Sequence, residues 1–172
     1  MNRPLPIKLF LTDVDGTLTD GGMYYSAQGD VMKKFNTRDG MGLQLLMKEG
    51  VKTGIITSED TEIVHRRFLK LGLDFLVQGK RYGGKLAATE EICRSLGISL
   101  DEVAYIGDDV NCAPLLEAAG FKACPADAMP QVKAIPGIHV MSLRGGEGCV
   151  REWINHFLLD ADDYFCKEVT DV

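Results

Sequence analysis

Short apolar runs alternate along the chain with longer segments whose apolar residues recur every three to four positions. Runs of four to seven residues rich in Val, Ile and Phe are typical of buried strands, and the longer period is that of amphipathic helices. The expected strands are Ile7–Thr12, Val51–Thr57, Phe75–Val77, Val103–Ile106, Phe121–Ala123 and Ile138–Met141. The expected helices are Gly40–Lys48, Thr61–Leu71, Lys85–Leu96, Ala113–Ala119 and Cys149–Leu159.

The order of these elements predicts the fold class. Strands and helices that alternate form a parallel sheet joined by right-handed crossovers. We therefore expect an α/β fold, a Rossmann-like parallel sheet with helices on both faces. One segment, Met23–Phe35, interrupts the alternation and has the pattern of a β-hairpin, with its turn at Gln28-Gly29-Asp30. Because it follows a pair of aspartates directly, we expect this hairpin to act as a flap over a site.

Length and composition indicate one domain, over residues 1–160, followed by an acidic tail over 161–172 without periodicity. The net charge of −6 argues against broad binding to nucleic acid or to anionic membranes, so neither is an expected partner. No apolar run is long enough for a secretory signal or a membrane span. The five cysteines are scattered and form no CxxC, which is typical of reduced thiols in the cytoplasm.

Polar residues gather where the expected strands end. Asp13 and Asp15 follow the first strand, Thr57 ends the second, and Asp108 follows Val103–Ile106. Lys85 opens a helix after a glycine-rich stretch. Ligands of open parallel sheets bind beyond the carboxyl ends of the strands, so these side chains are expected to converge there.

Three converging carboxylates without His or Cys partners favour a hard cation with oxygen ligands, most plausibly Mg²⁺. Such a site attracts phosphate, and a carboxylate beside it can form an aspartyl-phosphate while a second one moves protons. Each residue alone also fits a turn, a helix cap or a surface lysine. An EF-hand is excluded because Thr17 and Leu18 stand where Asp or Asn and Gly are needed.

These residues resemble the motifs of the haloacid dehalogenase superfamily of phosphotransferases, in the same order along almost the whole chain. DVDGT at 13–17 resembles the nucleophile motif, and Thr57, Lys85 and Gly107-Asp108-Asp109 resemble the other three. The resemblance implies that Asp13 is the nucleophile and Asp15 the acid/base, with Thr57 and Lys85 completing the catalytic set. It also implies that Asp13, Asp15 (through its backbone carbonyl) and Asp108 hold Mg²⁺.

A narrower resemblance is to the capless phosphatases that act on small 3-deoxy-2-keto sugar acid phosphates. FNTRDGMG at 35–42 and TEIVHRR at 61–67 look like their sequences. The substrate-binding residues that this resemblance implies are Asn36, Asp39, Gly40, Glu59 and Arg67. Glu59 replaces an arginine of the enzymes for octulosonate 8-phosphate, which serve lipopolysaccharide synthesis, and matches those for ketodeoxynonulosonate or N-acetylneuraminate 9-phosphate. We therefore expect a nine-carbon substrate, with the eight-carbon one as the alternative.

The chain departs from the family pattern at Cys112, where Asp is common, and at Ser58, where Gly is usual. The spacing between the motifs leaves no room for a cap domain, and in capless relatives a neighbouring subunit covers the site. We thus expect a homotetramer, with the hairpin and the segment 143–157 as candidate contacts. The periodicity of Trp153, Ile154 and Phe157 fits equally a helix that docks on its own core. A receiver domain is a rival reading, but its phosphorylated Asp lies on a middle strand. A non-catalytic assembly module is another, supported only by Cys112.

Overall fold

The computed structural model describes residues 6–158, so the expected acidic tail lies outside the described residues. Its sheet has six parallel strands in the order β5-β4-β1-β6-β7-β8. The strands are β1 (Leu9–Thr12), β4 (Lys52–Ile56), β5 (Phe75–Val77), β6 (Val103–Ile106), β7 (Phe121–Cys124) and β8 (His139–Val140). The helices are α1 (Thr37–Lys48), α2 (Glu62–Leu71), α3 (Gly84–Leu96), α4 (Ala113–Ala118), α5 (Pro130–Lys133) and α6 (Cys149–Leu158).

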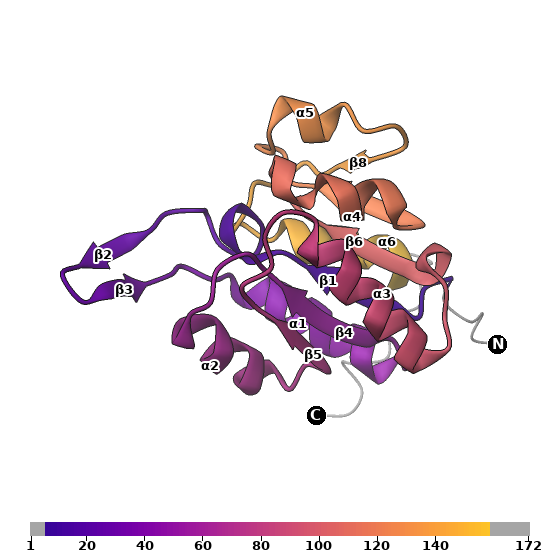
Figure 1. The fold of residues 1–172 in the computed structure, drawn as a ribbon, viewed down its shortest axis with the longest axis horizontal. Helices are drawn as coiled ribbons and strands as arrows, with labels where there is room; N and C mark the ends of the chain where they lie inside the picture. Colours follow the sequence, from indigo (N-terminus) through magenta and orange to yellow (C-terminus); the bar gives the residue numbers. More distant parts are fainter. Residues whose placement is uncertain (1–5, 159–172) are drawn as a thin grey trace, which may run out of the picture.

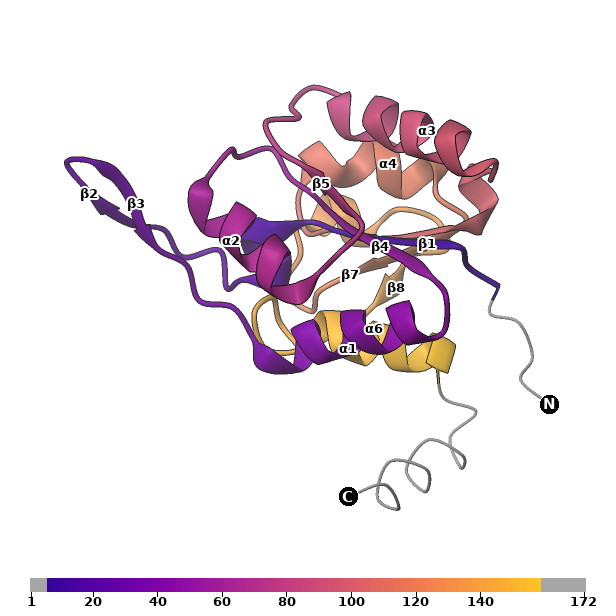
Figure 2. The ribbon, with the colours of Figure 1, turned by 90° about the horizontal axis from the view of Figure 1, so that it is seen from below.

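Helices cover both faces of the sheet (Figure 2), which confirms the predicted fold class. Strand β1 lies between β4 and β6, and its side chains alternate between the two faces. Phe10 packs with residues of α1, α2 and α6, while Leu9 and Leu11 pack with residues of α3 and α4. Because β1 is buried on both sides, it reads in the sequence as a continuous apolar run.

Helix α6 completes the core on the Phe10 side of the sheet. Trp153 and Ile154 are buried there, and the Trp153 ring lies 5.1 Å from the ring of Phe10. The apolar face of α6 is therefore used within the chain. The expectation that the segment around Trp153 offers a contact to another subunit is wrong for these buried side chains.

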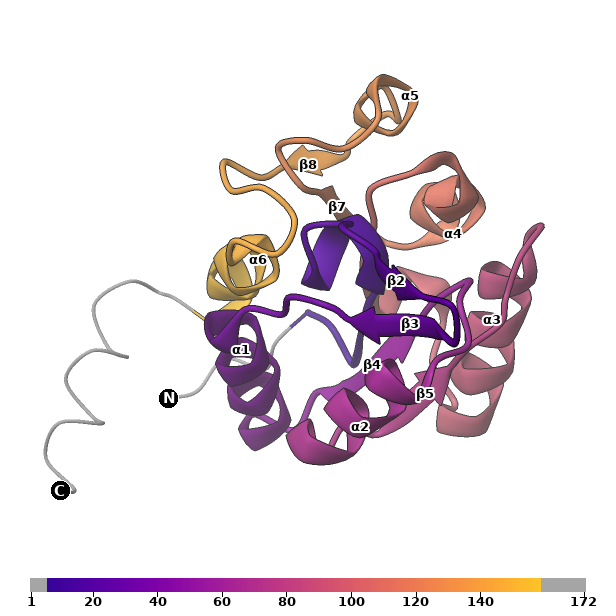
Figure 3. The same ribbon diagram turned by 90° about the vertical axis from the view of Figure 1, so that its left-hand side faces the viewer.

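The predicted hairpin consists of β2 (Tyr24–Ser26) and β3 (Gly29–Met32) and projects from the body of the molecule (Figure 1). Figure 3 shows it in front of the sheet, on the side where β1 ends. Ser26 pairs with Gly29, so the turn is at Ala27-Gln28, earlier than predicted. A bridge between Thr19 and Phe35 closes the base of the hairpin.

The hairpin and α1 are the only elements of regular structure between the turn after β1 and β4, so no cap domain is inserted there. The short helix α5 was not predicted, because four residues are too few to show a helical period. None of the helices that the structure describes combines the length and the apolar character that crossing a membrane requires.

Candidate active site at the carboxyl end of the sheet

The three central strands deliver their polar residues to one edge of the sheet. The N–H of Asp13 donates to the carbonyl of Ile106 at 3.0 Å, which ties the end of β1 to the end of β6. A cavity of about 280 Å³ opens at this edge. It is lined by Asp13, Asp15, Gly16, Gly21, Met23, Thr57, Ser58, Glu59, Asp108, Asp109 and Asn111.

Asp13 is buried and held by three donors. Its Oδ1 accepts the N–H of Val14 at 2.8 Å, and its Oδ2 lies 2.8 Å from Nζ of Lys85 and 2.9 Å from the thiol of Cys112. Lys85 reaches Asp13 from the first turn of α3 with a side chain only 2% exposed. Burial disfavours its ammonium form and is the largest single effect, but Asp13 and Cys112 together outweigh it and leave the pKa of Lys85 raised.

Asp13 and Asp108 bring two carboxylates close together. An oxygen of each lies within 4.8 Å of the other and of the Cys112 sulfur. Burial, and then the charge of Asp13, raise the pKa of Asp108 to about 7. Two acids that crowd each other in this way fit a divalent cation with oxygen ligands.

The Cys112 thiol does not belong to such a ligand set. Burial raises the pKa of Cys112 to about 12, so the sulfur keeps its proton. The thiol donates to Asp13 and is not a thiolate ligand, and sulfur suits Mg²⁺ poorly in any case. The oxygen atoms of Asp13 and Asp108 thus fit Mg²⁺ better than they fit a thiophilic metal.

The loop after β1 lies directly against Asp108. Gly16 has a φ of +80°, and a Cβ atom added to it would lie 2.0 Å from Oδ2 of Asp108. Only glycine fits both this backbone conformation and this space. The approach brings the backbone of the 13–16 loop to the Asp108 carboxylate, where the resemblance assigns the Asp15 carbonyl as a metal ligand.

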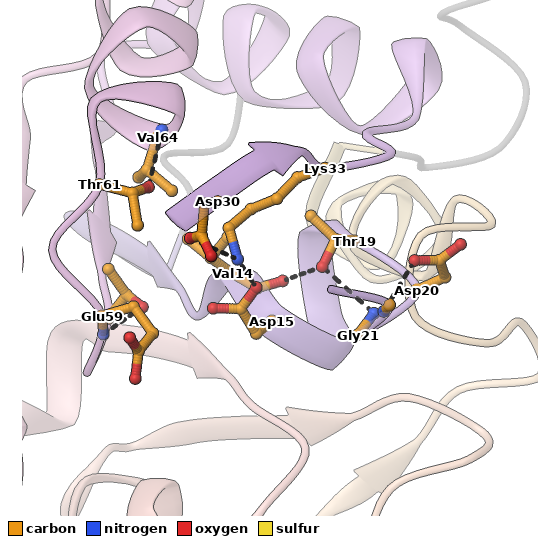
Figure 4. Close-up of polar contacts among 12 residues, drawn as sticks. Val14, Asp15, Thr19, Asp20, Gly21, Asp30, Lys33, Glu59, Thr61 and Val64 are labelled. Carbon is orange, nitrogen blue, oxygen red and sulfur yellow. Dashed lines mark hydrogen bonds and ion pairs between the residues drawn. The ribbon is translucent and has the colours of Figure 1, made fainter. Parts of the chain in front are cut away.

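Asp15 has a partner that the sequence did not indicate. Nζ of Lys33, just beyond β3, lies 2.6 Å from Oδ1 of Asp15 (Figure 4). The Lys33 side chain is only 1% exposed. The alternating pattern of the hairpin predicted a strand but could not reveal which of its lysines turns inward.

Thr57 and the residues after it form another wall of the cavity. The Thr57 hydroxyl is buried and accepts the N–H of Glu59 at 3.3 Å. Ser58 accepts a hydrogen bond from Asn111 at 2.9 Å, and Glu59 pairs with Arg81 at 2.9 Å. Arg81 follows β5, so a positive charge that the sequence did not single out meets Glu59 at the cavity.

Of the five residues expected to bind substrate, Glu59 lines the cavity, whereas the other four are not among the residues that line it. Asn36 caps α1 and donates to the carbonyl of Gly146. Arg67 donates to the carbonyl of Asn36, and Gly40 lies against its guanidinium. Asp39 is buried, with its Oδ1 accepting the N–H of Arg151 at the start of α6. Their role toward substrate stays a prediction.

Comparisons with known proteins place the chain in a family. A family model described as a haloacid dehalogenase-like hydrolase matches residues 38–120. The 3-deoxy-D-manno-octulosonate 8-phosphate phosphatase of Haemophilus influenzae is 38% identical over 146 residues, which are 85% of this chain and 79% of the relative. The chain belongs to the haloacid dehalogenase-like hydrolases. The corresponding phosphatase of Yersinia pestis is 36% identical over 163 residues, 94% of this chain and 85% of the relative.

Solved structures of haloacid dehalogenase-like hydrolases have the same fold. The cobalt-bound octulosonate 8-phosphate phosphatase of Haemophilus influenzae gives a TM-score of 0.84 at 36% identity, covering 89% of this chain and 88% of the other. The Moraxella catarrhalis enzyme, in complex with a magnesium ion, a phosphate ion and a KDO molecule, gives 0.84 at 37% identity, covering 90% and 87%. Membership of the family confirms the prediction of a hydrolase and excludes a receiver domain, and these relatives support a phosphatase.

Proposed function

We propose that the chain is a Mg²⁺-dependent phosphatase that removes the terminal phosphate of 3-deoxy-D-manno-octulosonate 8-phosphate through an aspartyl-phosphate on Asp13. The observation that carries this proposal is the buried Asp13 carboxylate, held by Lys85 and Cys112 at the wall of a cavity and close to Asp108. Relatives at 36–38% identity act on the eight-carbon substrate, which favours it over the nine-carbon one that Glu59 suggested.

Each residue of the site has a task in this reaction. Lys85 orients the Asp13 carboxylate by holding one of its oxygens. Thr57, at the end of the neighbouring strand, offers a hydroxyl toward the phosphate. Asp13, Asp108 and the Asp15 carbonyl would hold Mg²⁺, which when bound would supply positive charge that offsets the negative charge of the carboxylates and of the transferring phosphoryl group.

The reaction proceeds in two displacements. The Asp13 carboxylate attacks phosphorus, the bond from phosphorus to the ester oxygen breaks, and the Asp15 carboxyl proton goes to that oxygen to release the sugar alcohol. The Asp15 carboxylate then takes a proton from water as the water oxygen attacks the aspartyl-phosphate. Inorganic phosphate leaves, the Asp13 carboxylate is restored, and Asp15 is again protonated.

Phosphate release from the eight- and nine-carbon substrates, measured side by side, tests the reaction and its substrate together. We expect turnover that requires Mg²⁺, disappears with EDTA, and is higher in kcat/KM on the eight-carbon substrate. Asp13→Asn should abolish turnover while its melting curve shows a folded protein. Absence of phosphate release from either substrate, with folded wild-type protein and Mg²⁺ present, would leave the non-catalytic assembly module as the better reading.

We also propose a homotetramer, supported by apolar side chains that the hairpin exposes. These are Met23, Tyr24, Tyr25, Val31 and Met32. Exclusion of water from the site favours a charged transition state. A neighbouring subunit that packs on the hairpin would exclude water as a cap domain does in larger relatives. Light scattering should show four copies, and Val31→Asp should dissociate them while Leu69→Asp, an equally exposed position on α2, should not. A fully active monomer would refute this.

The predicted cytoplasmic location is retained as part of the proposal. The cysteines among the described residues are all free and buried. Free thiols are typical of a reducing compartment. Fractionation of cells that express the full chain would test the location directly.

A further inference from the structure

We propose that Lys33 is the positioning residue for Asp15, through which the hairpin is coupled to the acid/base step. This inference rests on the proposed function, because it concerns how that reaction's proton-transfer group is held. Lys33 does not line the cavity, so it would act on the reaction only through Asp15.

The contact is short and enclosed. Nζ of Lys33 lies 2.6 Å from Oδ1 of Asp15 and 4.0 Å from Oδ2 of Asp30, and the lysine side chain is 1% exposed (Figure 4). An ammonium group taken out of water at this depth is stable only when it is paired. Asp15 is its nearest carboxylate, and the pair joins residues 18 positions apart.

The pairing leaves the other oxygen of Asp15 available. Oδ2 of Asp15 is buried and has no hydrogen-bond partner within residues 6–158. Asp15 itself lines the cavity. Oδ1 can accept from Lys33 whether or not Oδ2 carries a proton. Rotation of the carboxyl group is therefore restricted in both states, and Oδ2 is the oxygen that gives and takes the proton of the reaction.

Both partners are anchored at the base of the hairpin. The bridge between Thr19 and Phe35 closes this base, and the Thr19 hydroxyl donates to the carbonyl of Val14 at 3.2 Å. The next residue, Lys34, points outward instead, with a side chain 58% exposed and 3.7 Å from Asp20. A shift of β3 would therefore move Lys33, and with it the Asp15 carboxylate, without moving Asp13 on the sheet.

The test compares Lys33→Met with Lys34→Met, the same substitution at the neighbouring exposed position. Activity is measured as kcat/KM on the sugar phosphate and on p-nitrophenyl phosphate, whose leaving group departs without a proton. We expect Lys33→Met to lower kcat/KM on the sugar phosphate at least about ten-fold more than on p-nitrophenyl phosphate. Lys34→Met should lower neither, and Lys33→Arg should restore part of the loss.

A double-mutant cycle with Asp15→Asn separates this role from a general effect on folding. In the Asp15→Asn background, Lys33→Met should cause little further loss on the sugar phosphate, because the group it positions is already disabled. An equal loss on both substrates, or a full additional loss in that background, would overturn the proposal. If the wild type itself released no phosphate, the proposed function would fail instead, so the two failures are distinguishable.

Discussion

The Cys112 thiol donates a hydrogen bond to Oδ2 of Asp13 at 2.9 Å, the same oxygen that Lys85 holds. Nζ of Lys85 also lies 3.3 Å from the Cys112 sulfur. A neutral donor thus occupies the position where the family resemblance implies an aspartate. Within residues 6–158, the carboxylate that forms an ion pair with Lys85 is that of Asp13.

Cys112→Asp should leave the metal requirement intact and should not lower turnover. The added carboxylate would lie next to the Lys85 ammonium, which can balance its charge. Rates at saturating substrate over a Mg²⁺ titration check this. Cys112→Ser, which keeps a donor to Asp13, is the matched control. A clear loss of activity in Cys112→Asp but not in Cys112→Ser would mean that the site requires a neutral donor at this position.

Gly16→Ala should reduce activity about 100-fold, because the new methyl group would displace Asp108 from its position beside Asp13. Gly50→Ala is the control: its φ of +81° is equally unfavourable for alanine, but nothing lies within 4 Å of the added atom. Each variant should lose about 1–2 kcal/mol of stability from backbone strain. Normal kcat/KM in Gly16→Ala would show that the loop and Asp108 adjust to each other.

The fold and the central residues of the site followed from the sequence because they depend on local patterns. Strand β1 is buried on both faces, so its apolar run and the aspartate after it could be read directly. Parallel strands then necessarily bring Asp13 and Asp108 to one edge. Gly16 could also be identified from the sequence, because it belongs to the DVDGT motif at 13–17.

The contacts made by long side chains could not be predicted in this way. Lys33 and Lys34 are chemically identical neighbours, and only the three-dimensional course of the hairpin turns one toward Asp15 and the other toward solvent. Arg81 meets Glu59 across two different loops. The prediction of a nine-carbon substrate treated Glu59 as an unpaired negative charge, because its ion pair with Arg81 could not be seen in the sequence.

Asp39→Asn should change how stability depends on pH. Burial, partly offset by N–H donors of Arg151 and Val150, raises the pKa of Asp39 to about 6, above the ordinary value near 4. The folded state therefore binds the Asp39 proton more strongly than the unfolded state does. As the pH rises from about 4 to about 6, the free energy of unfolding falls by about 3 kcal/mol in total because of this group. Asparagine removes that loss and can still accept the N–H of Arg151.

Denaturant melts at pH 4.5 and pH 7.5 check this. Asp39→Asn should gain stability relative to the wild type on going to the higher pH. Glu152→Gln is a control for which the opposite pH dependence is expected. Burial raises the pKa of Glu152, but hydrogen bonds from Ser142 and Leu143 outweigh burial and leave this pKa lowered. Glu152 thus stabilises the fold above its pKa, and its replacement should cost more at pH 7.5. If Asp39→Asn showed the same pH dependence of stability as the wild type, ionisation of Asp39 would not destabilise the fold, and the prediction would be contradicted.

Arg81→Ala should weaken binding of the sugar acid more than it affects chemistry. Glu59 alone would repel an anionic sugar from the cavity wall, and Arg81, 2.9 Å away, neutralises it and offers further donors to a carboxylate. Loss of one such charge-assisted contact should raise KM for the sugar acid phosphate about ten-fold, with kcat little changed.

KM for p-nitrophenyl phosphate, which has no sugar carboxylate, should hardly change. Arg66→Ala removes an exposed arginine that pairs with Glu62 on α2 and should affect neither substrate. An equal rise of KM on both substrates would instead mean that Arg81 supports the loop after β5, because a distorted cavity does not distinguish a sugar acid from an aryl phosphate.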